Sequence, residues 1–446
     1  MRNKLLPLLL ACLLLAAPSS AVYADTPILM AVVPPRFSDI SPEAWYAPFI
    51  RTLAGRGMID GYEDGTFRPS GSVTWGEALK LVLRGAGFAE QKAAKDAHWA
   101  AGYLSYARNS GYLPDDLDVL LDAPITRFEL ADLCAAALEL GAAEGASVFE
   151  DTARESVLQL YEAGIVEGSV LNGLRLYNGS GMLSRAEISA VLVRMQDYVD
   201  SHFVFVSGSR APIDFSLRFH SYDPAAFRME EGRMHCDDRD LSPRFGIDVS
   251  YFQGKIDWDA VAADGIDFAM IRCGFRGYGS EGTLNEDVRF RENIKGALDA
   301  GLDVGVYFFA QALSVKEALE EAEYVLDLMK DYKITFPVVY DWERITSAGS
   351  RSRSPDWDTV SDCAAVFCDA IAEAGYTPMT YFNKHMSYLQ LDMHKIQQYA
   401  AWLALYQSKP DYIYDFQMWQ YSSTGHVNGI AGRVDLDICF VDYANP

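Results

Sequence analysis

Two acidic residues in the C-terminal half of the chain have a spacing that suits chemistry on a glycosidic bond. Asp341 and Glu343 follow the apolar run 337–340, and side chains two positions apart on an extended backbone point to one face, about 7 Å from each other. Of two such carboxyl groups, one can donate a proton to the leaving oxygen while the other stabilises positive charge in the transition state. Burial and mutual repulsion separate their pKa values, which allows the two roles to differ.

The segments around these residues predict a fold that can bring them together with two more carboxylates, Asp248 and Asp435. Strands are expected at 245–249, 268–272, 303–309, 336–340, 379–382, 401–405 and 416–421, and helices at 285–300, 315–332, 359–374 and 386–397. Alternation of strands and helices predicts a parallel α/β sheet, and the number of units fits a (β/α) barrel. In such barrels the active site lies at the C-terminal ends of the strands.

Single acidic residues after strands are weak evidence, because many of them only cap helices, but a longer series of motifs is specific. Along the sequence the chain contains six motifs in the following order. They are Gly-Ile-Asp-Val-Ser-Tyr-Phe-Gln-Gly at 246–254, Ile-Asp-Trp at 256–258, Gly-Val-Tyr-Phe-Phe at 305–309, Asp-Trp-Glu at 341–343, Trp-Gln-Tyr-Ser-Ser at 419–423 and Val-Asp at 434–435. This series resembles glycoside hydrolase family 25, the lysozymes. The resemblance implies a catalytic domain over 245–446 that cleaves the β-1,4 bond between N-acetylmuramic acid and N-acetylglucosamine in peptidoglycan, without a metal or organic cofactor.

By that resemblance Glu343 is the general acid and Asp341 stabilises the developing positive centre, while Asp248 and Asp435 support them in the same pocket. The side chains implied to contact the sugar are Tyr307, Tyr381, Trp402, Trp419 and Gln420. A departure from the family is Leu405, where a polar residue is common, and it puts one sugar subsite in doubt. Retaining, inverting and substrate-assisted routes stay open at this point. A non-catalytic glycan-binding protein and a hydrolase of another N-acetylhexosamine polymer are the alternative functions.

The N-terminal half contains a pattern repeated three times, in the segments 36–88, 93–141 and 147–199. Each repeat has a Thr or Ser followed three residues later by Glu, which is a helix-capping box, and these boxes start at Thr74, Thr126 and Ser184, 52 and 58 residues apart. Apolar residues at helical spacing follow each box. Each repeat therefore predicts two helices around a Gly-rich loop, and the three must stack to bury a common core.

This pattern resembles the S-layer homology (SLH) repeat, whose best-known motif is Thr-Arg-Ala-Glu. The resemblance implies an α-helical domain that binds a secondary cell-wall polymer, a pyruvylated one, through the Arg of the box. Arg127 and Arg185 occupy that position in the second and third repeats, whereas the first repeat has Trp75. Plain helix caps without polymer binding are the competing interpretation.

The ends, the charge and the linker complete the expected organisation. Residues 1–24 have a basic start, an apolar run and small residues before Asp25, which predicts a signal peptide and export to the cell wall or surface. A lipoprotein signal ending at Cys12 is the alternative.

A net charge of −24 argues against nucleic acid as a partner, and no later apolar run is long enough to span a membrane. Residues 201–244 are expected to be a connector that packs on the catalytic domain.

Overall fold

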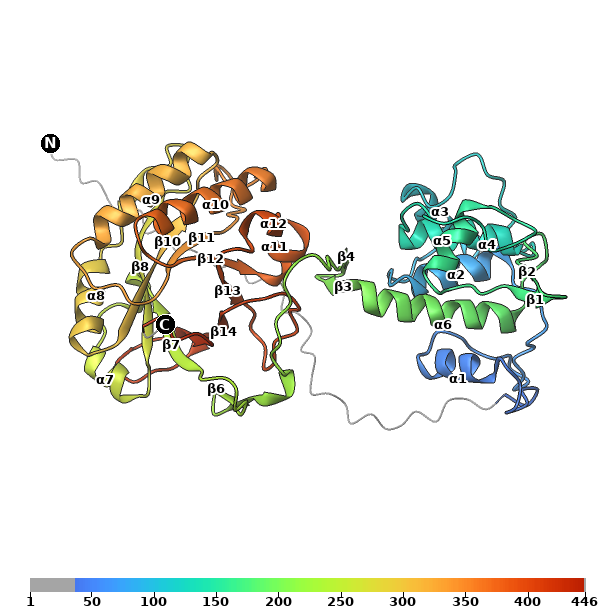
Figure 1. Ribbon diagram of the computed structural model, residues 1–446, viewed down its shortest axis with the longest axis horizontal. Helices are drawn as coiled ribbons and strands as arrows, with labels where there is room; N and C mark the ends of the chain where they lie inside the picture. Colours follow the sequence, from blue (N-terminus) through green and yellow to red (C-terminus); the bar gives the residue numbers. More distant parts are fainter. Residues whose placement is uncertain (1–36, 445–446) are drawn as a thin grey trace. The chain divides into compact units, whose positions relative to one another are not determined.

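The computed structural model describes residues 37–444, and the chain divides into two compact units at the His202–Phe203 peptide bond (Figure 1). The expected signal peptide, with its alternative at Cys12, lies outside the described residues. Within residues 37–444, no helix combines the length and the apolar character that crossing a bilayer requires.

The N-terminal unit is helical, as the repeats predict. Its helices are α1 (Ala47–Gly55), α2 (Trp75–Gly85), α3 (Ala101–Asn109), α4 (Arg127–Leu138), α5 (Glu155–Glu162) and α6 (Arg185–His202), and a small hairpin is formed by β1 (Ser169–Leu171) and β2 (Leu174–Leu176). The core lies between the helices that follow the boxes, where Leu79, Val82 and Leu192 are fully buried. Each repeat thus supplies two helices to one shared interior.

The three predicted capping boxes are confirmed. They consist of Thr74 with Glu77, Thr126 with Glu129, and Ser184 with Glu187. In each box the N-cap hydroxyl accepts from the Glu backbone N–H at 3.3 Å, and the Glu carboxylate accepts from the N-cap backbone N–H at 2.7–2.9 Å. Single β-bridges connect Ser72 to Ser184, Thr74 to Pro124 and Thr126 to Met182. The starts of the three helices α2, α4 and α6 therefore meet at one centre.

The C-terminal unit is a closed barrel of eight strands (Figure 1). In sheet order they are β10 (Asp303–Ala310), β11 (Val338–Trp342), β12 (Pro378–Asn383), β13 (Ala400–Ala404), β14 (Met418–Gly425), β15 (Val434–Cys439), β7 (Arg244–Val249) and β8 (Phe268–Arg276), and pairing of β8 with β10 closes the ring. A short strand β9 (Leu284–Glu286) pairs with the end of β8. The barrel interior is filled by Phe268, Met270, Tyr307, Phe336, Val339, Met379, Trp402, Met418 and Cys439.

One strand departs from the parallel sheet that the sequence predicts. β15 runs antiparallel to both of its neighbours, β14 and β7. The segment between β14 and β15 contains no helix, so the chain turns back beside β14 instead of crossing over to a parallel position. The barrel is therefore mixed, and the start of β15 lies at the same mouth as the ends of the parallel strands.

The helices lie outside the barrel, between successive strands. They are α7 (Trp258–Ala263), α8 (Phe290–Asp299), α9 (Val315–Met329), α10 (Trp357–Glu373), α11 (Lys384–Leu389) and α12 (Met393–Ile396). The helix expected over 386–397 is broken into α11 and α12, because Asp392 caps a new helix by accepting from the His394 N–H at 3.0 Å. The helix expected over 285–300 begins only at Phe290, since its first residues belong to β9.

The segment before the barrel, expected to be a connector, is part of the same packed core. It forms two hairpins, β3 (Phe203–Val206) with β4 (Ser209–Pro212) and β5 (Phe227–Glu230) with β6 (Arg233–Cys236). Phe227 is 1% exposed and packs edge-on against Trp419 and Phe440, while the Tyr222 hydroxyl donates to the Phe416 carbonyl at 2.6 Å. This segment covers the outer face of β14, which no helix of the described chain follows.

Phe227→Ala is therefore expected to destabilise the C-terminal unit by about 3–5 kcal/mol, the usual cost of removing a buried phenylalanine. The measurement is chemical denaturation of the whole chain, with the unfolding of the barrel followed by tryptophan fluorescence. Met229→Ala on the same strand is the control, because Met229 is 37% exposed and should change stability by less than about 0.5 kcal/mol. Equal stability of the two variants would show that the barrel does not depend on this segment.

Candidate active site

The four predicted carboxylates line a single cavity of about 230 Å³ at the mouth of the barrel. Asp248 lies near the end of β7, Asp341 near the end of β11, and Glu343 directly after β11. Asp435 lies near the start of the antiparallel strand β15 and is paired in register with Asp248. The reversed direction of β15 is what brings Asp435 to the same mouth as the other three.

Burial and mutual repulsion raise the pKa values of this cluster. Burial and then the charge of Asp435 raise the pKa of Asp248 well above its usual value. Burial and then the Glu343 carboxylate do the same for the pKa of Asp341, and burial with the charge of Asp435 raises the pKa of Glu343. For Asp435 itself, burial raises the pKa to about 6. The cavity therefore keeps protons near neutral pH, shared among interacting groups that titrate together.

A fifth carboxylate, Asp437, belongs to the same cluster and was not selected from the sequence. It is fully buried, accepts from the Trp402 indole N–H at 2.9 Å, and its charge raises the pKa of Asp248. Its position two residues after Asp435 was the available signal, because alternate residues of a strand share a face. Asp437 holds the Trp402 ring through this hydrogen bond, and burial and then the charge of Asp435 raise its own pKa well above the usual value.

Arg272 is the basic side chain that lines the cavity, and no local motif marks it. Its guanidinium opposes the rise in the pKa of Asp341 and forms an ion pair with the buried Asp287 at 2.7 Å. Arg272 and Asp287 are both far in sequence from the motif that contains Asp341 and Glu343. Only the closed barrel places a positive charge beside Asp341.

Of the five predicted sugar contacts, four line the cavity. They are Tyr307, Tyr381, Trp402 and Gln420. Gln420 donates to the Asp248 carboxylate at 2.7 Å and accepts from the hydroxyls of Tyr381 at 3.0 Å and Tyr406 at 2.9 Å. These bonds hold Asp248 and two tyrosines in fixed positions. Leu405, the departure from the family pattern, is buried in the outer core and does not line the cavity.

The prediction for Trp419 is wrong. Trp419 is fully buried in the layer outside the barrel, where its indole N–H donates to the Leu405 carbonyl at 2.7 Å. On β14 the residues Met418 and Gln420 face the interior, so Trp419 must face outward. Its ring packs against Phe227 instead of a sugar.

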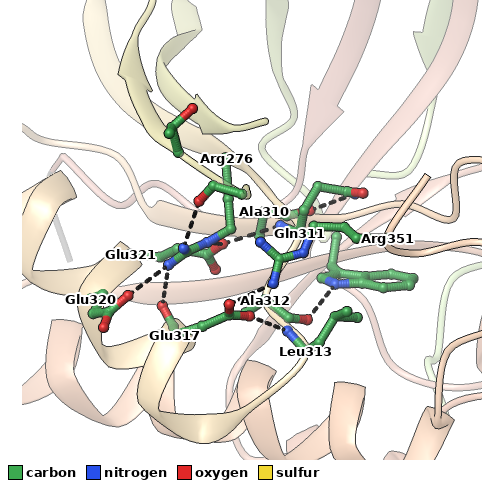
Figure 2. Close-up of polar contacts among 12 residues, drawn as sticks. Arg276, Ala310, Gln311, Ala312, Leu313, Glu317, Glu320, Glu321 and Arg351 are labelled. Carbon is green, nitrogen blue, oxygen red and sulfur yellow. Dashed lines mark hydrogen bonds and ion pairs between the residues drawn. The ribbon is translucent and has the colours of Figure 1, made fainter. Parts of the chain in front are cut away.

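The main chain of Glu343 is held by a buried polar network, of which Figure 2 shows Arg276, Gln311 and Glu321. The Gln311 amide nitrogen donates to the Glu343 carbonyl at 2.7 Å, and the amide oxygen accepts from the Ser352 hydroxyl at 2.5 Å. The backbone N–H of Gln311 donates to Glu321 at 3.1 Å, and the same Glu321 oxygen accepts from Arg276 at 2.7 Å. A buried ion pair adds little net stability, but this one holds the Glu321 carboxylate that accepts from Gln311, and the Gln311 side chain links the end of β10 to the residue after β11.

In the N-terminal unit, Arg127 and Arg185 lie in two separate grooves. The Arg127 groove, about 390 Å³, is lined in part by Trp45, Arg127, Tyr177, Glu187 and Arg194. The Arg185 groove, about 340 Å³, is lined in part by Asp60, Glu77, Lys80, Trp99 and Arg185. Each arginine pairs with the capping-box glutamate of another repeat, Arg127 with Glu187 and Arg185 with Glu77, the latter at 3.3 Å.

The first repeat breaks this pattern. Trp75 occupies the position of the arginine, is 5% exposed and cannot form an ion pair with a glutamate. The two grooves that contain an arginine also contain an exposed tryptophan, Trp45 at 59% and Trp99 at 49%. The Arg127 groove and the Arg185 groove thus each combine a positive charge with an accessible aromatic ring.

A barrel whose mouth carries clustered carboxylates is the architecture of a glycoside hydrolase, and comparisons with known proteins identify the family. Residues 247–430 match the family described as glycosyl hydrolases family 25, and residues 36–79 match the S-layer homology domain. The chain therefore contains a family 25 glycoside hydrolase domain preceded by an S-layer homology domain. The SLH match covers the first repeat, and the capped helices α4 and α6 repeat its pattern.

Two sequence relatives and one solved structure are similar to parts of this chain. The chain is 27% identical over 198 residues to the autolytic lysozyme of Clostridium acetobutylicum, covering 43% of this chain and 54% of that protein. It is 29% identical over 233 residues to lysozyme M1 of Streptomyces globisporus, covering 48% of this chain and 76% of that protein. The structure of the modular autolysin LytC from Streptococcus pneumoniae with a synthetic peptidoglycan ligand aligns at 22% identity and a TM-score of 0.41, covering 53% of this chain and 58% of that one. The chain thus spans about half the length of the Clostridium relative.

Proposed function

We propose that this chain is an exported N-acetylmuramidase, which hydrolyses the β-1,4 bond between N-acetylmuramic acid and N-acetylglucosamine in peptidoglycan. The observation that carries the proposal is the convergence of Asp248, Asp341, Glu343 and Asp435 on one cavity. Two relatives named lysozymes support the same substrate.

In the proposed reaction Glu343 protonates the oxygen of the leaving sugar. The raised pKa of Glu343 supports this role, because a general acid must still hold its proton near neutral pH. Asp341 stabilises the positive charge that develops on the other sugar, and Arg272 beside it opposes the rise in the pKa of Asp341 that burial and Glu343 cause. Asp248 and Asp435 complete the negative field, and Tyr307, Tyr381 and Trp402 form the walls around the sugar.

Product analysis tests this assignment. Purified peptidoglycan digested with the full chain is expected to give fragments whose reducing end is N-acetylmuramic acid, detected by reduction with borohydride and mass spectrometry. Fragments that end in N-acetylglucosamine would instead identify a glucosaminidase. Absence of any new reducing ends, compared with a Glu343→Gln digest, would support a protein that only binds glycan.

We further propose that the N-terminal unit anchors the enzyme to a pyruvylated secondary cell-wall polymer at the cell surface. The arginines and exposed tryptophans of the two grooves support this, since a carboxylate on a sugar needs a cation and the sugar ring needs an apolar face. A local positive site operates despite the net charge of −24, because salt screens charges beyond about 8–10 Å.

A further inference from the structure

The catalytic cavity is too small to hold a glycan strand. Its volume is about 230 Å³, whereas pockets for drug-sized ligands occupy roughly 300–1,000 Å³. A polymer bound for cleavage must therefore extend past the cavity onto the protein surface. Residues at the rim then determine how tightly the neighbouring sugars bind.

The aromatic residues predicted to contact sugars offer little ring surface. Trp402 is 1% exposed and Tyr307 is 9% exposed, so both serve mainly as walls of the barrel interior. By contrast, Phe252 also lines the cavity and is 63% exposed. Tyr406 is 55% exposed, but its hydroxyl is committed to Gln420. Phe252 is therefore the most accessible aromatic face among the residues that line the cavity.

Phe252 is held in place although it is exposed. It lies in the short 3-10 turn Tyr251–Gln253, where the Ser250 hydroxyl accepts from the Phe252 N–H at 3.3 Å. Its ring packs against Tyr251 with centroids 4.1 Å apart and the ring planes tilted by 31°. The Arg272 guanidinium lies 5.5 Å from the Phe252 ring and 5.1 Å from the Tyr251 ring.

The backbone of this turn is anchored to the same charged residues. The Tyr251 N–H donates to Asp287 at 3.1 Å, and Asp287 also pairs with Arg272. An exposed apolar ring held by a turn, a neighbouring ring and a cation loses little freedom when a ligand covers it. Such preorganisation lowers the entropy cost of binding.

We infer that Phe252, supported by Tyr251, is a sugar-stacking residue that binds the apolar C–H face of a pyranose ring next to the cleaved bond. The inference rests on the proposed muramidase function and names a further contact for its substrate. Stacking on the ring removes apolar surface of both partners from water and needs no charge, which suits a neutral sugar beside an acidic cavity. Because Phe252 touches a sugar away from the reacting atoms, it contributes to binding more than to the chemical step.

The first test is steady-state hydrolysis of soluble, uncrosslinked peptidoglycan strands by the full chain. Phe252→Ala is expected to raise KM by about five- to twentyfold with kcat within about twofold of wild type, and Phe252→Trp is expected to retain a KM close to wild type. Phe215→Ala is the matched control, because Phe215 is 62% exposed and does not line the cavity. A KM for Phe252→Ala within twofold of wild type, or equal losses in Phe252→Ala and Phe252→Trp, would overturn the inference.

A binding measurement separates this inference from the proposed function. In the Glu343→Gln background, affinity for the same strands is measured by calorimetry with and without Phe252→Ala, and the dissociation constant is expected to rise about five- to twentyfold. Turnover plays no part in this result, so an inactive wild type would contradict the muramidase assignment alone. Unchanged affinity, or no binding in either variant, would overturn the role of Phe252.

Discussion

Glu343→Gln is expected to lower the rate of peptidoglycan hydrolysis by about 10²–10⁴-fold, the usual contribution of a general acid. The substitution keeps the size of the side chain and removes the proton that the leaving sugar oxygen must receive. The turbidity of a cell-wall suspension, followed with time, gives the rate. The midpoint temperature of thermal unfolding of the variant should equal or exceed that of wild type. The reason is that a neutral amide replaces one carboxyl group in a buried cluster whose members repel one another.

The matched control is Glu323→Gln, an exposed glutamate on α9 outside the cavity, which should leave the rate unchanged. A Glu343→Gln rate within tenfold of wild type would contradict the role of Glu343 as the acid. The remaining candidates would then be the other buried carboxylates of the cluster, with Asp341 first because its pKa is raised well above the usual value.

Arg127→Ala combined with Arg185→Ala is expected to abolish sedimentation of the chain with purified cell walls. In each groove, one arginine side chain forms an ion pair with a capping-box glutamate. Removing that arginine leaves the glutamate carboxylate unpaired, and this carboxylate would repel the proposed anionic polymer. Loss of charge-assisted hydrogen bonds in both grooves should raise the dissociation constant by about 100-fold or more. The assay uses the Glu343→Gln background, so that the walls are not digested.

Each single arginine variant should reduce sedimentation only in part, because the other groove is intact. Arg51→Ala, an exposed arginine on α1 that lines neither groove, is the control for loss of one positive charge. Circular dichroism must show the same helix content in every variant. Sedimentation of the double variant at the wild-type level would exclude these arginines as the polymer contacts.

The sequence predicted well wherever a local rule decides the structure. Capping boxes depend on residues three positions apart, so Thr74, Thr126 and Ser184 marked helix starts directly. The same holds for Asp341 and Glu343, because Asp341 is near the end of strand β11 and Glu343 comes directly after it. Asp248 and Asp435 came together because β15 runs antiparallel to β7, which places the start of β15 at the same mouth as the ends of the parallel strands.

Features that depend on distant partners were missed. The side of β14 on which Trp419 lies depends on the register of a strand whose first four residues are buried on both faces, so alternation of apolar and polar residues does not indicate it. Arg272 and Gln311 act on Asp341 and Glu343 only through the folded barrel. The packing of Phe227 on β14 likewise has no counterpart in local sequence, because a hairpin can cover any apolar face that lacks a helix.

Trp75 has a consequence for how firmly the enzyme is held on the wall. With two arginine grooves in place of three, the proposed anchor is bivalent, and a chain that releases one polymer strand stays tethered at millimolar effective concentration through the other. In a bivalent anchor, release from both grooves at once is rarer than release from one groove. Under the proposed anchoring, we expect the hydrolase to change its position on the wall one polymer strand at a time instead of remaining where it first binds.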